Sequence, residues 1–275
     1  MMWIRFIMMC MFLVTITACS SSPSPIDHDN KNAAQDETKK EEHEIHWSYS
    51  GDTGPEYWEA LDSSFKACGR GMKQSPINLE DAKANKTSEA DIRINYQPSS
   101  FTIKNNGHTV QADTNTDENS IVIDDKEYKL VQFHFHVPSE HQMEGKNLDM
   151  ELHLVHKSED DQLAVLGVLM KAGKENKTLA ELWSKLPKEE SEENILLEEE
   201  INLSSLLPQD KTAYHYNGSL TTPPCSEGVK WTVFAEPISV SQEQIDLFTS
   251  VFPDNHRPVQ PWNDRDVYEV LTHEN

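Results

Sequence analysis

The stretch Leu130-Val-Gln-Phe-His-Phe-His-Val137 predicts a β-strand that has two chemically different faces. Successive side chains of a strand point to opposite faces, so Gln132, His134 and His136 share one face and the two phenylalanines share the other. An apolar face of this kind predicts packing against a core. The opposite face then presents two imidazoles and an amide side by side.

A second stretch, Met150-Glu-Leu-His-Leu-Val-His156, repeats this period-two alternation. Glu151 and His153 share one face of the predicted strand, and His156 points to the opposite face. If the two strands are neighbours in a sheet, His134, His136 and His153 converge on one point.

Further segments predict a fold in which a sheet dominates. Strands are expected at residues 120–124, at 229–234, and at 163–170, where a continuous apolar run is typical of a strand buried on both faces. Helices are expected at residues 178–186, starting from a Thr178 cap, and at 241–252, with Ser241 as cap and Gln244 three residues on. We therefore predict a mixed α/β, sheet-dominant single domain round a large, mostly antiparallel, twisted β-sheet with short peripheral helices.

The N-terminus predicts export. A short positive start, an apolar run over residues 6–18 and a small-residue exit are typical of a secretory signal. The exit, Ile16-Thr-Ala-Cys19, resembles a bacterial lipobox, in which the cysteine is lipidated; an ordinary signal cleaved near Ala18 is the alternative. We predict a signal peptide at 1–18, a lipidated, disordered tether at 19–44, and one domain at 45–275. The protein is then a lipoprotein of the bacterial cell membrane, on its outer surface or periplasmic face.

Charge excludes one class of partner. The chain has 24 basic and 47 acidic residues, a formal net charge of −23. Phosphate binding needs clustered Lys and Arg, so we expect no nucleic acid as a partner.

Four cysteines are present, of which Cys10 lies in the predicted signal and Cys19 is the predicted lipid site. Cys68 and Cys225 remain in the exported body, where oxidising conditions favour a disulfide between them. Two unrelated thiols are the alternative.

The three histidines have the character of a catalytic zinc site. Three neutral nitrogen ligands with a fourth position open are typical of catalytic zinc, whereas a structural site is closed by four protein ligands. His-x-His on a strand is weak evidence alone, but Glu151 and Gln132 offer acceptors for the second nitrogens. The spacing His134-x-His136-x-x-x-Glu140 also resembles a cupin motif, but the glycines that cupins need around it are missing.

A series of motifs resembles the α-class carbonic anhydrases, in their bacterial, exported lipoprotein form. Any one of the motifs is weak, but their order and spacing are specific. They are Trp47-Ser-Tyr49, Gln74-Ser-Pro-Ile-Asn78, Asn105-Asn-Gly-His108, Gln132-Phe-His-Phe-His136, Ser139-Glu-His141, Glu151-Leu-His-Leu-Val155, Ala164-Val-Leu-Gly167, Tyr216-Asn-Gly-Ser-Leu-Thr-Thr-Pro-Pro224 and Asn255-His-Arg-Pro-Val-Gln-Pro261.

The resemblance implies reversible hydration of carbon dioxide to bicarbonate and a proton by a zinc-bound hydroxide. Thr221 matches the hydroxyl that accepts a hydrogen bond from the hydroxide and donates one to Glu140, and His108 matches the proton shuttle. The zinc ligands, their acceptors, the substrate contacts and the disulfide are also implied. The implied zinc ligands are His134, His136 and His153, and their hydrogen-bond acceptors are Gln132 and Glu151. The implied substrate contacts are Val155, Val165, Leu220, Thr222, Val229 and Trp231. The implied disulfide joins Cys68 to Cys225.

Two other functions stay open at this point. Some carbonic anhydrase-like domains are non-catalytic binding modules, although those have usually lost zinc histidines. A zinc esterase is the other option, as a side activity. His141 and His156 are expected to be structural, and the sequence predicts no oligomeric state.

Overall fold

One large β-sheet organises the part of the chain that the computed structural model describes, residues 45–85, 90–191 and 194–274. The predicted signal peptide, Cys19 and the tether at 19–44 lie outside the described residues. No helix among the described residues is long and apolar enough to cross a membrane.

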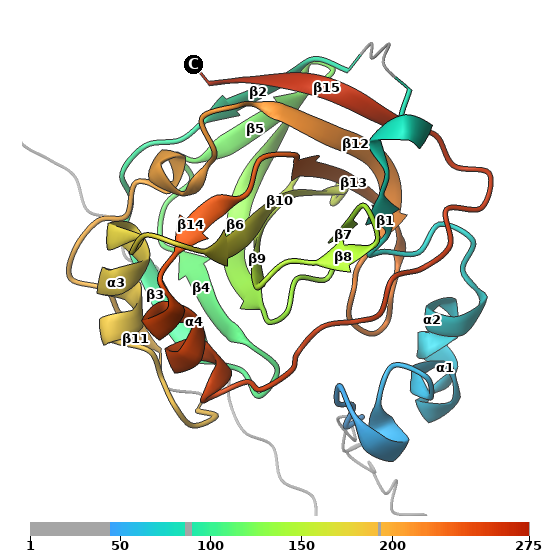
Figure 1. Ribbon diagram of the computed structural model, residues 1–275, viewed down its shortest axis with the longest axis horizontal. Helices are drawn as coiled ribbons and strands as arrows, with labels where there is room; N and C mark the ends of the chain where they lie inside the picture. The colour runs from blue at the N-terminus through green and yellow to red at the C-terminus, as the bar shows by residue number, and fades with distance from the viewer. Residues whose placement is uncertain (1–44, 86–89, 192–193, 275) are drawn as a thin grey trace, which may run out of the picture. The chain divides into compact units, whose positions relative to one another are not determined.

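The sheet has twelve strands and curls into a ring (Figure 1). They are β2 (Ile92–Asn95), β3 (Phe101–Asn105), β4 (Val110–Thr114), β5 (Ser120–Ile123), β6 (Lys126–His136), β9 (Met150–Lys157), β10 (Leu163–Ala172), β11 (Ile195–Leu196), β12 (Thr212–Ser219), β13 (Glu227–Phe234), β14 (Ile238–Val240) and β15 (Val267–Glu274). The path runs β11-β3-β4-β6-β5-β2-β15-β12-β13-β10-β14, and β9 closes the ring by pairing with both β10 and β6.

Most pairings are antiparallel, as the sequence predicts. Only β10–β13, β10–β14 and β15–β2 are parallel among the described pairs of this sheet. A small second sheet joins β1 (Asn78–Leu79), β7 (Gln142–Met143) and β8 (Lys146–Asn147). The expectation of a sheet-dominant α/β fold is confirmed, and the strand expected at 163–170 lies in the middle of the sheet, buried on both faces.

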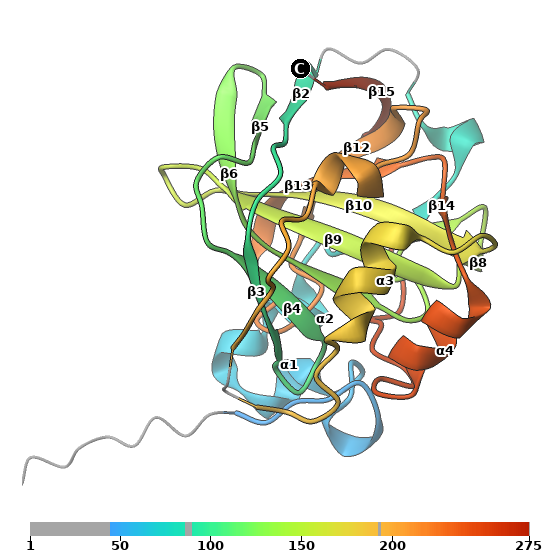
Figure 2. The same ribbon diagram turned by 90° about the vertical axis from the view of Figure 1, so that its left-hand side faces the viewer.

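The outer face of the sheet is covered by α3 (Lys177–Ser184) and α4 (Gln242–Thr249); in Figure 2, α3 lies in front of β9, and α4 lies beside α3. Phe133 and Phe135 point to this face, and the Phe135 ring lies 4.7 Å from that of Trp183 on α3 and 5.9 Å from that of Phe248 on α4. The apolar face of β6 is therefore buried against the helices, so its histidine face must point the other way.

The N-terminal caps of α3 and α4 differ in how well they follow the sequence predictions. Ser241 and Gln244 form the reciprocal capping box that the sequence predicts for α4. The Thr178 cap is wrong: Asn176 caps α3 by accepting from the Leu179 N–H at 3.2 Å. Asparagine is at least as good an N-cap as threonine, and the Thr178 hydroxyl instead contacts Ser205.

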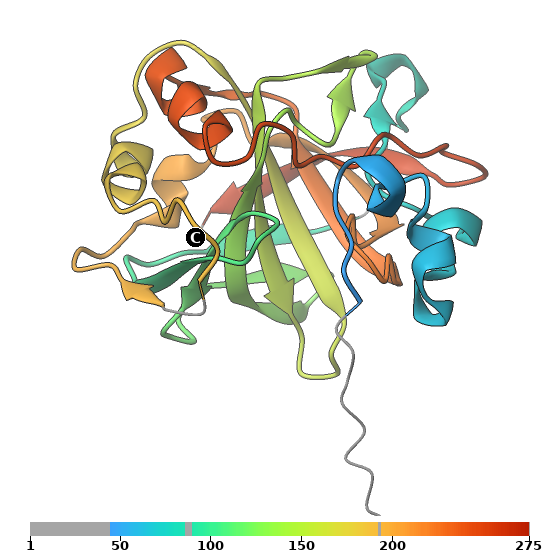
Figure 3. The same cartoon turned by 90° about the horizontal axis from the view of Figure 1, so that it is seen from below.

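The N-terminal segment carries α1 (Trp58–Leu61) and α2 (Ala67–Arg70), well apart from α3 and α4 (Figure 3). Cys68 on α2 and Cys225 form a disulfide with a Cα–Cα distance of 5.0 Å, which confirms the expected pairing. Short 3-10 turns complete the description: Gly51–Thr53, Ser63–Phe65, Asp81–Lys83 and Leu203–Leu206.

Candidate metal centre

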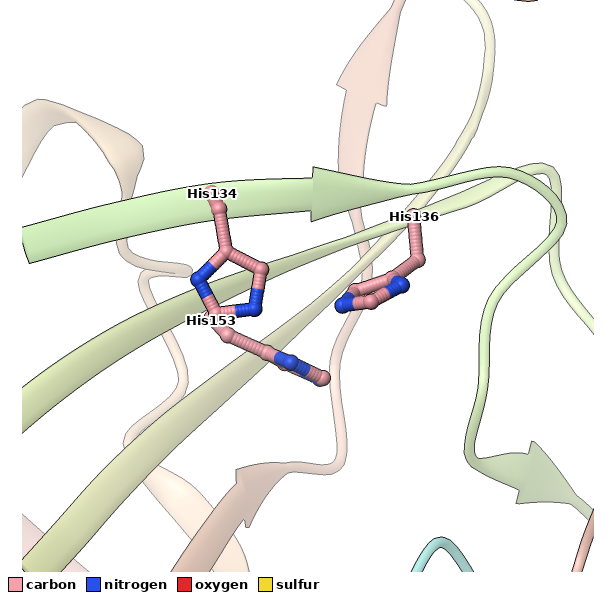
Figure 4. A group of neighbouring side chains, drawn as sticks. All are labelled: His134, His136 and His153. Carbon is pink, nitrogen blue, oxygen red and sulfur yellow. The ribbon is translucent and has the colours of Figure 1, made fainter. Parts of the chain in front are cut away.

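Three imidazoles meet where β6 lies beside β9. The antiparallel register sets His134 directly opposite His153, and His136 follows two residues along the same face. One ring nitrogen from each histidine lies within 4.8 Å of the others. Figure 4 shows the three rings pointing toward one another from the two strands. The structure thus brings together the three predicted ligands.

The remaining nitrogen of each ring has an acceptor of its own. His134 Nδ1 donates to Gln132 Oε1 at 2.8 Å, and His153 Nε2 donates to Glu151 Oε1 at 3.0 Å. His136 Nδ1 donates to the backbone carbonyl of Asn255 at 2.7 Å. These bonds set each ring's tautomer and orientation. They leave His134 Nε2, His136 Nε2 and His153 Nδ1 for the centre.

The free nitrogens are suited to a metal ion. Burial lowers the pKa of His134 well below its ordinary value, that of His136 to about 4, and that of His153, so all three rings are neutral near pH 7. Among the described residues, His136 Nε2 is buried without a hydrogen-bond partner, which is rare for a polar atom unless an ion or water belongs there. A neutral, largely buried, all-nitrogen donor set fits zinc.

Glu140 faces this centre from the loop after β6. Its Oε2 lies 3.6 Å from His136 Nε2 and 3.9 Å from His153 Nδ1, and it makes no hydrogen bond of ordinary length within the described parts of the chain. Its Oε1 accepts from the Arg257 backbone N–H at 2.8 Å. Burial raises the pKa of Glu140, and His153, the Arg257 N–H and the Thr221 hydroxyl lower it only in part.

Glu151 is held in its charged form by four donors. Oε1 accepts from His141 and His153, and Oε2 accepts from the backbone N–H groups of Glu140 and His141 at 2.9 and 2.8 Å. Burial raises the pKa of Glu151, but the two histidines outweigh it and hold the pKa well below its ordinary value. His141 also bonds Tyr216 through Nε2 at 2.6 Å, so both of its nitrogens are occupied and it offers no lone pair to a metal.

An apolar wall lies on the same face as the histidines. One cluster contains the buried side chains of Val155, Val165, Val229 and Trp231, with the half-buried Leu220 packed against it. The sequence predicts this set, and the structure brings all five together. Thr221 is buried and Thr222 half-buried at the start of the turn that follows Leu220.

His108 sits at the tip of the Asn-Gly turn between β3 and β4. Asn106 Oδ1 accepts from the backbone N–H groups of His108 and Thr109, which fixes the turn. The half-buried imidazole stacks on the Trp47 ring at a centroid distance of 3.7 Å and an interplanar angle of 7°. A titratable imidazole is therefore held at the edge of the domain by aromatic contact.

Two residues of the centre escape sequence reasoning. Asn255 holds His136 through its backbone carbonyl, and its side-chain Nδ2 donates to the His108 carbonyl at 3.0 Å. Arg257 is buried and binds Glu140 through its backbone N–H. Both belong to the motif Asn255-His-Arg-Pro, and the sequence carries no other sign of their roles, because backbone groups act independently of residue type.

His156 lies on the opposite face of β9, in the main core, as predicted. Its Nε2 contacts the Tyr96 hydroxyl at 2.8 Å, and the ring is fully buried. Burial lowers its pKa to about 3. It is a neutral core residue, remote from the metal centre by its orientation.

Comparisons with known proteins agree with this geometry. The family described as eukaryotic-type carbonic anhydrase matches residues 53–271. A carbonic anhydrase of Nostoc sp. is 43% identical over 230 residues, covering 82% of this chain and 87% of the relative, and one of Klebsiella pneumoniae is 44% identical over 226 residues, covering 82% and 91%. The solved structure of an α-carbonic anhydrase from Thermovibrio ammonificans with sulfanilamide superposes with a TM-score of 0.79 at 43% identity, covering 82% of this chain and 99% of that one.

The buried His156 predicts acid sensitivity. An unfolded histidine titrates near pH ~6.5, whereas the folded pKa is about 3. Between these values the unfolded state binds a proton that the folded state does not, so the free energy of unfolding falls as pH falls, by up to about 1.4 kcal/mol per pH unit. We expect His156→Gln, measured by urea unfolding from pH 6.5 to 4, to show a shallower decline than the wild type. His273→Gln, at an exposed position, should keep the wild-type decline; equal slopes for His156→Gln and the wild type would contradict the assignment.

Proposed function

The chain belongs to the eukaryotic-type, α-class carbonic anhydrase family and catalyses the reversible hydration of carbon dioxide to bicarbonate, and from this premise we propose that His134, His136 and His153 hold a catalytic zinc ion. The observation that carries the proposal is the set of three converging, neutral nitrogens whose outer partners leave them free for an ion. When bound, zinc lowers the pKa of a coordinated water molecule to near ~7 and so supplies the nucleophile.

Thr221 orients that nucleophile in our proposal. A hydroxyl has one proton to donate, and Glu140 is the acceptor beside it because the Arg257 N–H already occupies Glu140 Oε1 and leaves Oε2 open. With zinc held by the three histidines, the Thr221 oxygen would be free to accept a hydrogen bond from the nucleophile and so to orient it toward the carbon atom of the substrate. Thr222, the next residue, offers a second polar contact for bicarbonate.

Carbon dioxide rests on the apolar wall. The substrate has no charge and no proton to donate, so a dry surface beside the nucleophile is sufficient to hold it. Val155, Val165 and Val229 supply branched aliphatic groups, and Leu220 and Trp231 complete the surface. Bicarbonate carries a charge that this surface does not stabilise, which favours its release.

His108 carries the proton outward. Each hydration releases a proton, and an imidazole is the side chain whose ordinary pKa allows it to accept and release protons near pH 7. The stacking on Trp47 and the fixed Asn-Gly turn keep the ring between the interior and solvent. His108 therefore serves as a relay and takes no part in the attack on the substrate.

The domain works outside the cytoplasm. A disulfide between Cys68 and Cys225 is typical of proteins in oxidising compartments. We propose in addition that Cys19 is lipidated and anchors the protein to a bacterial membrane, on the strength of the Ile16-Thr-Ala-Cys19 motif and the polar segment after it. Stable anchoring requires more than one acyl chain.

The zinc proposal predicts that metal and activity are lost together. His134 is the partly exposed member of the triad, so His134→Ala should fold and yet lose both bound zinc and carbon dioxide hydration, measured by atomic absorption and stopped-flow. His256→Ala, matched in residue type and outside the triad, should keep both. Wild-type protein that hydrates carbon dioxide without zinc, or holds zinc without activity, would refute the proposal.

The role of Thr221 predicts a loss in the chemical step. Thr221→Ala should lower kcat/KM by about 10²-fold, the usual effect of removing one group that organises a transition state, while zinc content stays unchanged. Thr221→Ser keeps the hydroxyl and should recover most of the activity. If Ser and Ala variants are equally impaired, the hydroxyl is not the functional group.

The lipid anchor predicts a change of partition with one substitution. Expressed with its own N-terminus in a bacterium, the wild type should enter the detergent phase on Triton X-114 separation and incorporate a labelled fatty acid. Cys19→Ser should do neither, and Cys10→Ser should behave as the wild type. If Cys19→Ser still incorporates the labelled fatty acid, Cys19 is not the lipidated residue and the proposal is wrong.

A further inference from the structure

An acidic side chain lies against the turn that carries His108. Gly107 has φ +83°, and a Cβ atom added to it would lie 3.0 Å from Glu190 Cδ and 3.1 Å from each carboxylate oxygen. The carboxylate of Glu190 thus occupies the space beside Gly107, one residue before the imidazole. Glu190 is exposed, so this carboxylate is also in contact with solvent.

The position of Glu190 is fixed by the backbone on both sides. The Ser191 N–H donates to the Asn105 carbonyl at 3.1 Å, and Asn105 Nδ2 donates to the Pro187 carbonyl at 3.2 Å. The buried Asn105 side chain also accepts from the Gly107 N–H at 3.0 Å. The turn and the segment after α3 are therefore joined, and the carboxylate is held at the turn by more than its own flexible side chain.

Geometry bounds the distance to His108. Successive Cα atoms are about 3.8 Å apart and a Cα–Cβ bond measures about 1.5 Å. With 3.1 Å from that Cβ position to each oxygen, the Glu190 carboxylate oxygens lie within about 8.4 Å of the His108 Cα atom. The imidazole extends from this Cα atom, and water molecules are the link between it and the exposed carboxylate in our inference, because water chains transfer protons between positioned side chains.

We propose that Glu190 is the outer proton acceptor for His108, an inference that rests on the proposed shuttle and extends it. The protonated imidazole gives its N–H proton to an intervening water molecule, which passes a proton to a carboxylate oxygen of Glu190. The carboxylic acid then releases the proton to a buffer base and returns to the carboxylate. No electron is transferred, and each proton taken up by Glu190 leaves to solution.

A purely electrostatic role for Glu190 is the weaker explanation. Glu190 is exposed, so water and salt weaken the field of its charge at the imidazole. Glu189, the acidic residue next to it on the same segment, is also exposed and serves as the matched charge control. A specific effect of Glu190 therefore requires proton transfer and not charge alone.

The test compares Glu190→Gln with the matched control Glu189→Gln in the zinc-loaded enzyme, using stopped-flow carbon dioxide hydration. In weak buffer, Glu190→Gln should lower kcat by about threefold to tenfold, less than a full general base contributes because water substitutes in part. The value of kcat/KM should not change, since hydration precedes this transfer. Concentrated imidazole buffer should restore kcat, and Glu189→Gln should match the wild type.

Further variants separate this inference from the shuttle itself. In a His108→Ala background, Glu190→Gln should have no additional effect. The inference is overturned if Glu190→Gln behaves as the wild type, if Glu189→Gln is equally slow, or if the effect persists without His108. If His108→Ala is not slowed in weak buffer, the shuttle fails; if it is slowed and Glu190→Gln is not, only the role of Glu190 fails.

Discussion

The pairing of β6 with β9 in one register is the constraint on which the site depends. It sets His134 opposite His153 and His136 opposite Glu151, with one phenylalanine on each side of His134 pointing to the core. A slip of one residue would turn every side chain of a strand to the other face. Two aromatic rings would then leave the helices, and the imidazoles would enter an apolar core. Burial of these phenylalanines, at roughly 2 kcal/mol or more each, thus fixes the metal face indirectly.

A buried carboxylate completes this constraint. Glu151 is fully buried, and an unpaired charge there would be very costly. Four donors converge on it, and Gly167 on β10 provides the room, because a Cβ at Gly167 would lie 3.0 Å from Glu151 Oε1. Gly167 is paired with His153 in the sheet. Because Gly167 on β10 has no side chain, the Glu151 carboxylate has room to reach the His153 ring on β9.

The sequence predicts what depends on side-chain alternation and fails where backbone groups act. The period-two patterns predict which strand faces carry His134, His136 and His153, whereas their convergence also requires that the two strands be neighbours, which the patterns alone do not show. The acceptor for His136 could not be predicted, since it is the carbonyl of Asn255, distant along the chain and independent of residue type. Closure of the ring by β9 is equally hidden, because nothing local shows that one strand pairs on both edges. Asn176 and Thr178 are both good N-cap residues and lie two positions apart, so the sequence alone does not decide which of them caps α3.

Arg257 connects the disulfide to the metal centre, because it bonds both Cys68 and Glu140. Its guanidinium, fully buried, donates to the carbonyls of Cys68 and Ser75, each at 2.7 Å, and its backbone N–H holds Glu140. Burial lowers its pKa to about 10, so it stays charged near pH 7 and requires these acceptors.

On the other side of the bridge, Cys225 closes a turn by donating its N–H to Thr222 at 2.8 Å, next to Thr221. The two members of the Glu140–Thr221 pair come from segments far apart in the chain. One is tied to Cys68 through Arg257 and the other to Cys225 through a single turn. A covalent bond between the cysteines therefore limits how far the segments that carry Glu140 and Thr221 can separate, so under the proposed roles of these two side chains the bridge bears on catalysis as well as on stability.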